Sequence, residues 1–164
     1  MKANQRKRWN DSAMANIYKI KGTMNKKTTV YLRYQATSEW RASALKKANY
    51  KCEISGKKSC GKNPLVVHHL TKSFDEIVRD AHKQLNIDFH KTIDDYNKDD
   101  LKALIELIKE IHKEVEAIVL TDQLHTKIHT LFGSNPRPEE VKSYKKTFRR
   151  KQYKDKNYNY NKIA

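Results

Sequence analysis

The chain has 164 residues, which is enough for one domain and too few for two of ordinary size. Hydrophobic residues make up 37% and charged residues 33%, so the core must be small, and no run approaches the length of about 18 apolar residues that a membrane span needs. The formal net charge is +16, and the excess lies at the two ends, which is typical of a globular body whose basic arms bind nucleic acid or an anionic membrane surface.

Residues 1–37 are polar and rich in lysine, and they predict a basic N-terminal arm with one short strand at 28–33. From Ser38 onward, Trp40 and Ala44 stand at helical spacing and predict a helix. The next letters, CEISGKKSCGKNP, hold two glycines and a proline and predict a turn-rich loop.

The run LVVHHL predicts a short strand over residues 65–70. Ser73 and Glu76 are spaced as a capping box, which indicates that a helix begins there. Two amphipathic helices are expected within about 71–116, as an insertion between this strand and the next. Their apolar stripes consist of Phe74, Ile77, Val78, Ala81 and Leu85 in the first helix and of Leu101, Leu104, Ile105, Ile108, Ile111 and Val115 in the second.

Residues 117–120 predict a second strand. Thr121 is expected to cap the following helix through its hydroxyl, and Gly133 is expected to end it. The buried side of that helix is expected to consist of Leu124, Ile128, Leu131 and Phe132.

The basic tail, residues 134–164, is expected to form one helix near 138–152 and to end in a disordered segment. The expected fold class is α+β and mostly helical. A domain at 38–133 would lie between the N-terminal arm and this tail.

Four histidines stand where metal chemistry would need them. His125 and His129 are four residues apart, so their rings share one helix face and can reach a single ion. His68 and His69 are adjacent in a strand and point to opposite faces, so one of them can join the pair while the other stays uncoordinated. Three imidazoles with an open position suit a catalytic metal site, and the fourth imidazole could accept a proton from water.

The segments WRASALKKANYKCEISGKK, LVVHHL and AIVLTDQLHTKIHTLFG resemble the HNH endonucleases, particularly the phage or homing type. The resemblance covers roughly residues 38–133. It implies a ββα-metal core and cleavage of double-stranded DNA with one divalent ion, of which Mg, Mn and Zn are candidates. It also implies that the compartment is the cytoplasm of a bacterial or phage-infected cell. The basic start of the sequence is not followed by the apolar stretch of a secretory signal, which also favours the cytosol.

By position, the resemblance makes His68, His125 and His129 the metal ligands and His69 the general base. The asparagine that orients the base in the family falls near Glu116, which is therefore the candidate for that role. Many relatives bind a structural zinc through two CxxC pairs, but Cys52 and Cys60 do not form such pairs and are interpreted as ordinary thiols.

The basic ends are expected to bind DNA phosphates. The candidate residues are Arg6, Lys7, Arg8, Lys145, Lys146, Arg149, Arg150 and Lys151. Arg41 is an equally good candidate for a phosphate contact or a salt bridge, and Trp40 is expected to anchor the core.

Among the remaining histidines, His112 is expected to be partly buried and hydrogen-bonded, and His82 and His90 are expected at the surface. Tyr153, Tyr158 and Tyr160 could stack on bases, although a disordered tail is favoured.

Two other functions remain open at this stage. In one, a metal merely stabilises a small finger in a non-catalytic DNA-binding protein. In the other, the nuclease acts on RNA.

Overall fold

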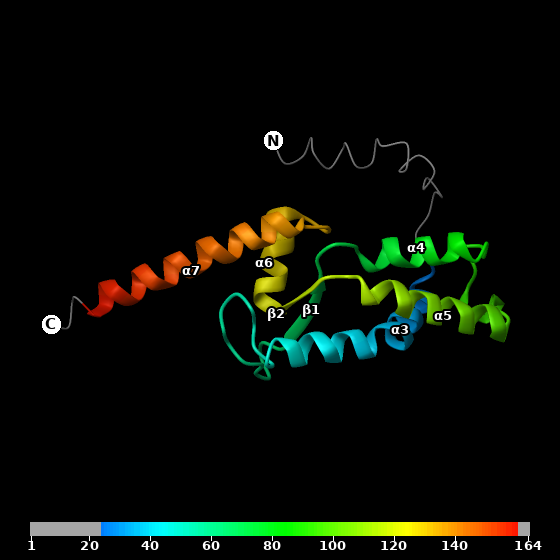
Figure 1. The fold of residues 1–164 in the computed structure, drawn as a ribbon, viewed down its shortest axis with the longest axis horizontal. Helices are drawn as coiled ribbons and strands as arrows, with labels where there is room; N and C mark the ends of the chain where they lie inside the picture. Colours follow the sequence, from blue (N-terminus) through cyan, green and yellow to red (C-terminus); the bar gives the residue numbers. More distant parts are fainter. Residues whose placement is uncertain (1–23, 161–164) are drawn as a thin grey trace.

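A computed structural model describes the backbone of residues 24–160 and the side chains of residues 24–153. In this part of the chain, strands β1 (Leu65–His69) and β2 (Ala117–Thr121) form a two-stranded antiparallel sheet. The sheet lies between two groups of helices (Figure 1). One group is α3 (Lys26–Lys47), α4 (Phe74–Gln84) and α5 (Lys98–Lys113), and the other is α6 (Asp122–Phe132) and α7 (Pro138–Tyr160). The expectation of an α+β, mostly helical fold is confirmed.

The register of the sheet decides which side each histidine of β1 faces. His68 pairs with Ile118 and His69 pairs with Ala117. Ile118 belongs to the hydrophobic cluster formed with α6 and α7, so His68 lies on that side. His69 points the opposite way, toward α3, α4 and α5, because successive residues of a strand alternate between its faces.

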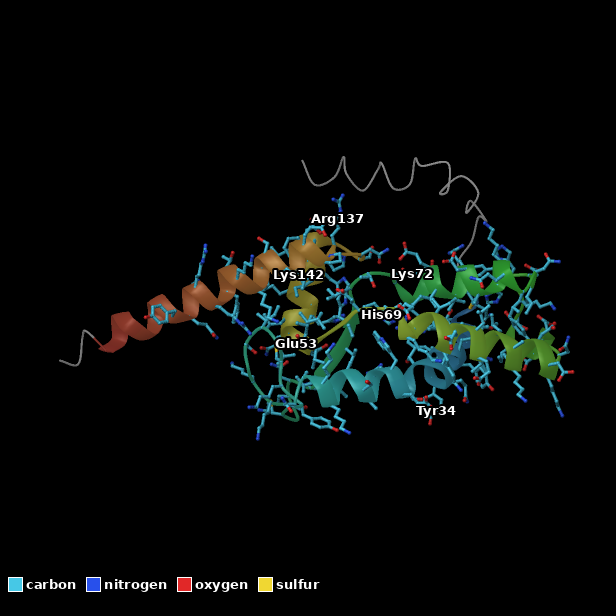
Figure 2. The ribbon with its side chains drawn as sticks, in the orientation of Figure 1. Tyr34, Glu53, His69, Lys72, Arg137 and Lys142 are labelled. Carbon is cyan, nitrogen blue, oxygen red and sulfur yellow. The ribbon has the colours of Figure 1, made fainter. Side chains whose placement is uncertain are left out.

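Glu53, in the loop before β1, covers the outer edge of β2 (Figure 2). Its backbone N–H donates to the Val119 carbonyl at 2.8 Å, and its Oε1 accepts from the Val119 N–H at 3.0 Å. On α7, Lys145 Nζ lies 3.5 Å from Glu53 Oε2, and the Arg149 guanidinium donates to the Glu53 carbonyl at 3.1 Å. Glu53 therefore connects α7 to the sheet.

The expected strand at 28–33 is wrong, because these residues belong to the first half of α3. The side chain of Asn25 caps the helix by accepting from the Lys27 N–H, and Thr28, Leu32 and Ala36 are buried at intervals of four residues. This helical burial overrides the β-propensity of the TTV segment. Residues 26–37 are thus part of the helical core, while residues 1–23, with Arg6, Lys7 and Arg8, lie outside the described residues.

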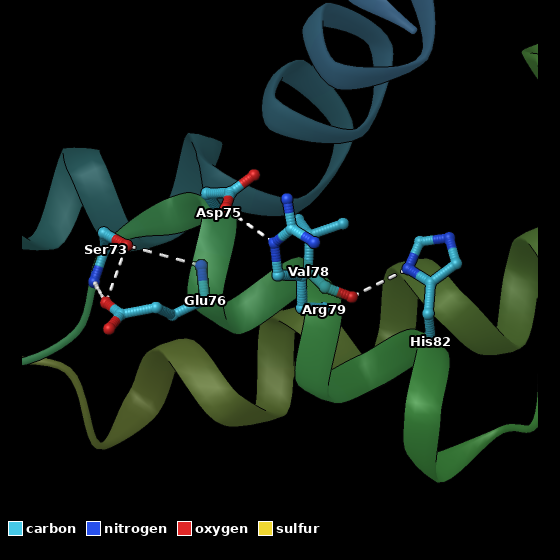
Figure 3. A network of polar contacts seen from close by, with 6 residues as sticks. All are labelled: Ser73, Asp75, Glu76, Val78, Arg79 and His82. Carbon is cyan, nitrogen blue, oxygen red and sulfur yellow. Dashed lines mark hydrogen bonds and ion pairs between the residues drawn. The ribbon is translucent and has the colours of Figure 1, made fainter. Parts of the chain in front are cut away.

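Helix α4 begins at the predicted capping box (Figure 3). Ser73 Oγ accepts from the Glu76 N–H, and Glu76 Oε2 accepts from the Ser73 N–H at 2.8 Å. The predicted surface position of His82 is wrong, since only 2% of this residue is exposed. Its Nδ1–H donates to the Val78 carbonyl at 2.7 Å, and its Nε2 accepts from the Tyr96 hydroxyl at 2.7 Å. His90 is exposed as expected.

Helices α4 and α5 complete their apolar stripes by packing with α3. Leu32 of α3, Ile77 of α4 and Ile108 of α5 are fully buried in this cluster. Trp40 packs against it, as expected, and its Nε1–H donates to the Val115 carbonyl at 3.1 Å. This bond attaches α3 to the segment that leads into β2.

Residues in the first half of α7 pack against the body of the molecule. Val141 is buried in the cluster that Ile118 of β2 forms with α6 and α7. Tyr144 and Phe148 pack against that cluster. The rest of the helix continues away from the body (Figure 1) and reaches Tyr160, beyond the expected end near 152. In the described part of the chain, no helix is both long enough and apolar enough to cross a membrane.

The burial of His82 generates a prediction about pH. Burial lowers the pKa of His82 below the ordinary value of 6.5, so the native chain binds fewer protons than the unfolded chain in mildly acidic solution. Unfolding free energy should therefore fall as the pH drops below about 6.5. His82→Gln should reduce the slope of unfolding free energy against pH by at most about 1.4 kcal/mol per pH unit. Urea titrations between neutral pH and pH ~5 measure this slope.

Tyr96→Phe is the matched control, because it keeps the imidazole and removes its hydroxyl partner. It should cost about 1–3 kcal/mol at neutral pH while leaving the pH slope in place. If His82→Gln left this slope unchanged, His82 would not be a source of the pH dependence.

Candidate metal centre

Three imidazoles from β1 and α6 meet on one side of the sheet. The ligand atoms of His68, His125 and His129 all lie within 4.8 Å of one another. The His68 ring lies edge-on to both helical rings, with centroid distances of 5.2 Å to His125 and 4.9 Å to His129. The structure thus brings together the three histidines that the sequence singles out as ligands.

The hydrogen bonds of His129 determine which of its nitrogens is free. Its Nδ1 lies 2.9 Å from the Gly133 carbonyl, which can only accept, so Nδ1 carries the proton. The Nε2 of the neutral ring therefore has a lone pair, and it lies 3.1 Å from Nε2 of His125. Gly133, whose φ is +82°, thus ends the helix as expected and also orients the ring through its carbonyl, as outer-shell partners of metal ligands do.

His68 is the buried member of the group. Its Nε2 is buried and has no hydrogen-bond partner among the described residues. A buried polar nitrogen without a partner is costly, and a bound cation would remove that cost. Burial, and then the neighbouring His125 and His129, lower the pKa of His68 to about 4, so the ring is neutral and able to bind a metal at neutral pH.

The loop before β1 fixes the position of α6. The Pro64 carbonyl accepts from the Asp122 N–H at 2.9 Å, and Asn63 Oδ1 accepts from the Gln123 N–H at 3.2 Å. These bonds satisfy two backbone N–H groups in the first turn of α6 and connect that turn to the start of β1. The expected hydroxyl cap from Thr121 is wrong, because its side chain makes no capping hydrogen bond and Asn63 takes that role. The expected burial of Leu131 is also wrong, because this residue is exposed, whereas Leu124 and Ile128 are buried.

The three histidines fit a divalent ion with open coordination positions. Two nitrogens bound to one tetrahedral ion at about 2.0–2.1 Å stand roughly 3.3 Å apart, close to the separation within the helical pair. The described residues supply no fourth histidine, cysteine or carboxylate to the group, and Cys52 and Cys60 are free thiols outside it, as expected. Three imidazoles favour zinc, nickel or copper over magnesium.

His69 occupies a different environment, on the face of β1 that lies toward α3, α4 and α5. Its ring stacks on Trp40 with a centroid distance of 4.3 Å, and its Nε2 lies 3.1 Å from Nε2 of His112. Burial, followed by the influence of His112 and Arg33, lowers the pKa of His69 to about 3. His69 is thus a neutral imidazole held by packing.

The prediction that Glu116 orients His69 does not match the structure. Glu116 is exposed, and its carboxylate lies 3.9 Å from Lys142 Nζ. The position next to His69 is taken by His112, which is hydrogen-bonded as expected and is fully rather than partly buried. Its place on the Leu104/Ile108 face of α5 could be inferred from helical spacing, whereas its contact with His69 depends on how α5 packs against β1.

Two arginines of α3 lie near His69. Arg33 stacks over Phe74, with its guanidinium carbon 4.7 Å from the ring centroid. Burial, and then the charge of Arg41, lower the pKa of Arg33, and both arginines also lower the pKa of His69. Neither forms an ion pair with a described carboxylate.

The five candidate phosphate-binding residues of α7 divide into two groups. Lys145 and Arg149 bind Glu53 and hold the helix in place. Lys146, Arg150 and Lys151 are exposed. Tyr153 is also exposed, while the side chains of Tyr158 and Tyr160 lie outside the described residues.

Comparison of the chain with protein-family models, with curated proteins and with solved structures finds no match. What the site can do therefore follows from its own geometry.

The geometry predicts one divalent-ion site. Zn²⁺ or Ni²⁺ should bind to the metal-free protein with 1:1 stoichiometry in calorimetry, and 100 Kd of free metal should stabilise the fold by about 2.7 kcal/mol. His68→Ala and His129→Ala should each abolish the stoichiometric site and the stabilisation. His90→Ala, which removes an exposed imidazole, is the control, and wild-type affinity in His68→Ala would contradict this assignment.

Proposed function

We propose that the protein is a metal-dependent DNA endonuclease of the HNH type, in a phage or homing context. The observation that carries the proposal is the convergence of His68, His125 and His129, with a buried unpartnered Nε2 on His68 and a further histidine next to it in the strand. The order β1, β2, α6, with ligands from the first strand and the helix, fits the ββα-metal core that the resemblance implies.

In this proposal the histidines on the two faces of β1 have different roles. His68, His125 and His129 would hold the divalent ion on the α6 side. When bound, the ion supplies polarisation of a phosphate oxygen and stabilisation of the departing 3′ oxygen. His69 is the last residue of β1, so a phosphodiester lying across the end of the strand would face His69 on one side and the three ligands on the other. His69 then accepts the proton of the attacking water.

The charges around His69 support a phosphate at this position. Arg33 and Arg41 add positive charge on the α3 side, without a described carboxylate to neutralise it. Guanidinium groups bind phosphate through paired N–H donors. A phosphate anion placed there would also raise the basicity of His69, which the two arginines lower in the free protein.

One observation favours the second candidate, a non-catalytic DNA-binding protein with a metal-stabilised finger. His69 is stacked on Trp40 and hydrogen-bonded to His112, as a structural histidine would be. In that protein the ion would fix α6 against β1, and DNA would bind without being cut.

Cleavage of supercoiled plasmid separates the two candidates. Metal-free protein supplied with Mg²⁺, Mn²⁺, Ni²⁺ or Zn²⁺ should nick the plasmid with at least one ion, and EDTA should stop the reaction. His69→Ala should lower the rate on the order of 10²- to 10⁴-fold, because it removes the proton acceptor. Its metal affinity, measured by calorimetry, should stay within a few-fold of wild type.

His125→Ala should lose both metal and cleavage, while His90→Ala should lose neither. Plasmid that is retarded in a gel but never cut with any ion would favour the second candidate. Cleavage of RNA in preference to duplex DNA would redirect the proposal to an RNA substrate.

The exposed cations of α7 generate a separate prediction. Replacing Lys146, Arg150 and Lys151 with alanine should weaken duplex binding and reduce the steepness of log Kd against log[salt] by up to about 3, since each phosphate contact contributes about 0.9. Fluorescence anisotropy with a labelled duplex measures both. The control replaces Lys98, Lys102 and Lys109 of α5, which removes the same charge at the other end of the molecule and should change the salt slope little. If both triple variants changed the slope equally, the exposed cations of α7 would not be the DNA-binding surface.

A further inference from the structure

The contact between His69 and His112 joins two imidazoles through like nitrogens. Nε2 of one lies 3.1 Å from Nε2 of the other, and His112 is 1% exposed. A hydrogen bond between two such atoms requires one ring to be protonated at Nε2 and the other to have a lone pair there.

The backbone of α5 decides which ring donates. Nδ1 of His112 lies 2.7 Å from the carbonyl of Ile108, one turn earlier in the helix. A carbonyl only accepts, so the proton of His112 is on Nδ1, and the Nε2 of the neutral ring must accept. His69 is therefore the donor at Nε2, and its lone pair is on Nδ1.

We propose that His112 is a positioning residue that holds His69 in its Nε2–H tautomer and thereby makes Nδ1 the atom that accepts the proton of the attacking water. The tautomer assignment stands on the contacts of His69 and His112 alone. The part concerning the attacking water rests on the proposed function.

Packing fixes the orientation of the same ring. Trp40 stacks on His69 with an interplanar angle of 29°, and Trp40 is itself held by its hydrogen bond to the Val115 carbonyl. His112 stands edge-on to both rings, with centroid distances of 5.3 Å to each. The stack fixes the plane of the His69 ring, but a flip of about 180° around Cβ–Cγ would preserve it. Such a flip would put Cε1 in the place of Nε2 and break the hydrogen bond to His112, so this bond determines the direction in which Nδ1 points.

A histidine in this place differs chemically from the carboxylate expected at Glu116. A carboxylate would also accept from Nε2–H, but it would add a negative charge that favours the imidazolium. The neutral His112 holds the tautomer without that charge. An asparagine or glutamine side chain would serve equally well, since its carbonyl oxygen accepts a hydrogen bond and carries no charge.

The tautomer is measured directly by long-range ¹H–¹⁵N NMR of the imidazole nitrogens in metal-free, histidine-labelled protein, with His69→Gln used to assign the signals. In the wild type, His69 should show the Nε2–H pattern, with a protonated Nε2 and an unprotonated Nδ1. A His69 signal of the Nδ1–H type, or an exchange average of the two tautomers, would overturn the proposal.

Two variants separate positioning from packing. His112→Gln retains an acceptor and should keep the Nε2–H pattern, whereas His112→Phe fills the space without an acceptor and should give a mixture of tautomers. If His112→Phe keeps the wild-type pattern, His112 does not fix the tautomer. Should His112→Phe fail to fold, the wild-type spectrum and His112→Gln still decide the point.

Plasmid cleavage then tests the catalytic consequence. His112→Gln should cut within about tenfold of the wild-type rate, and His112→Phe should be slower by about 10² or more, as expected when a general base is held in the wrong tautomer. Metal affinity should be equal in both variants. A wild type that shows the Nε2–H pattern but cuts no plasmid would overturn the proposed function and leave the tautomer assignment standing.

Discussion

Much of the described structure depends on one constraint, namely that a backbone carbonyl accepts hydrogen bonds and never donates them. Three histidines place Nδ1 against such a carbonyl within their own helix or at its end: His82 against Val78, His112 against Ile108 and His129 against Gly133. Each neutral ring must therefore present a lone pair at Nε2. That lone pair meets the Tyr96 hydroxyl in the first case, the imidazole of His69 in the second, and the imidazole of His125, another candidate metal ligand, in the third.

The alternation of β1 then gives the two neighbouring histidines different surroundings. His68 lies beside His125 and His129 of α6, where a cation would be the partner that its buried nitrogen lacks. His69 enters an aromatic site made by α3, α4 and α5 and already has a partner. The helices between the strands thus complete the surroundings of the candidate base as well as packing with α3. A shift of one residue in the pairing of β1 with β2 would exchange the two environments, which makes the register a condition of the site.

Local pattern in the sequence predicts most of the elements, because capping residues and apolar periodicity act over a few residues. The capping box at Ser73, the stripe of α5 and the glycine after α6 are examples. The errors lie where distant parts of the chain decide. Residues 28–33 have strand-forming side chains, but they bury a helical stripe against α4 and α5. Glu116 has the right spacing in the sequence for a residue that orients His69. The residue that contacts His69 is instead His112, which lies four residues earlier, in α5. The spacing of His125 and His129 predicts the helical half of the cluster, and only strand alternation with the observed pairing selects His68 as the third member.

Glu53 has a consequence that extends beyond the single molecule. A strand at the edge of a sheet offers unpaired N–H and C=O groups on which a second chain can add a strand, the first step of aggregation. Glu53 satisfies both backbone groups of Val119, one with its own N–H and the other with its carboxylate, and so acts as a third strand one residue long. Its second carboxylate oxygen, toward Lys145, keeps charge at the same edge, where an incoming apolar strand would have to desolvate it. The residue that anchors α7 thereby also occupies the edge of β2 at Val119, where a second chain would otherwise have two free backbone groups to pair with.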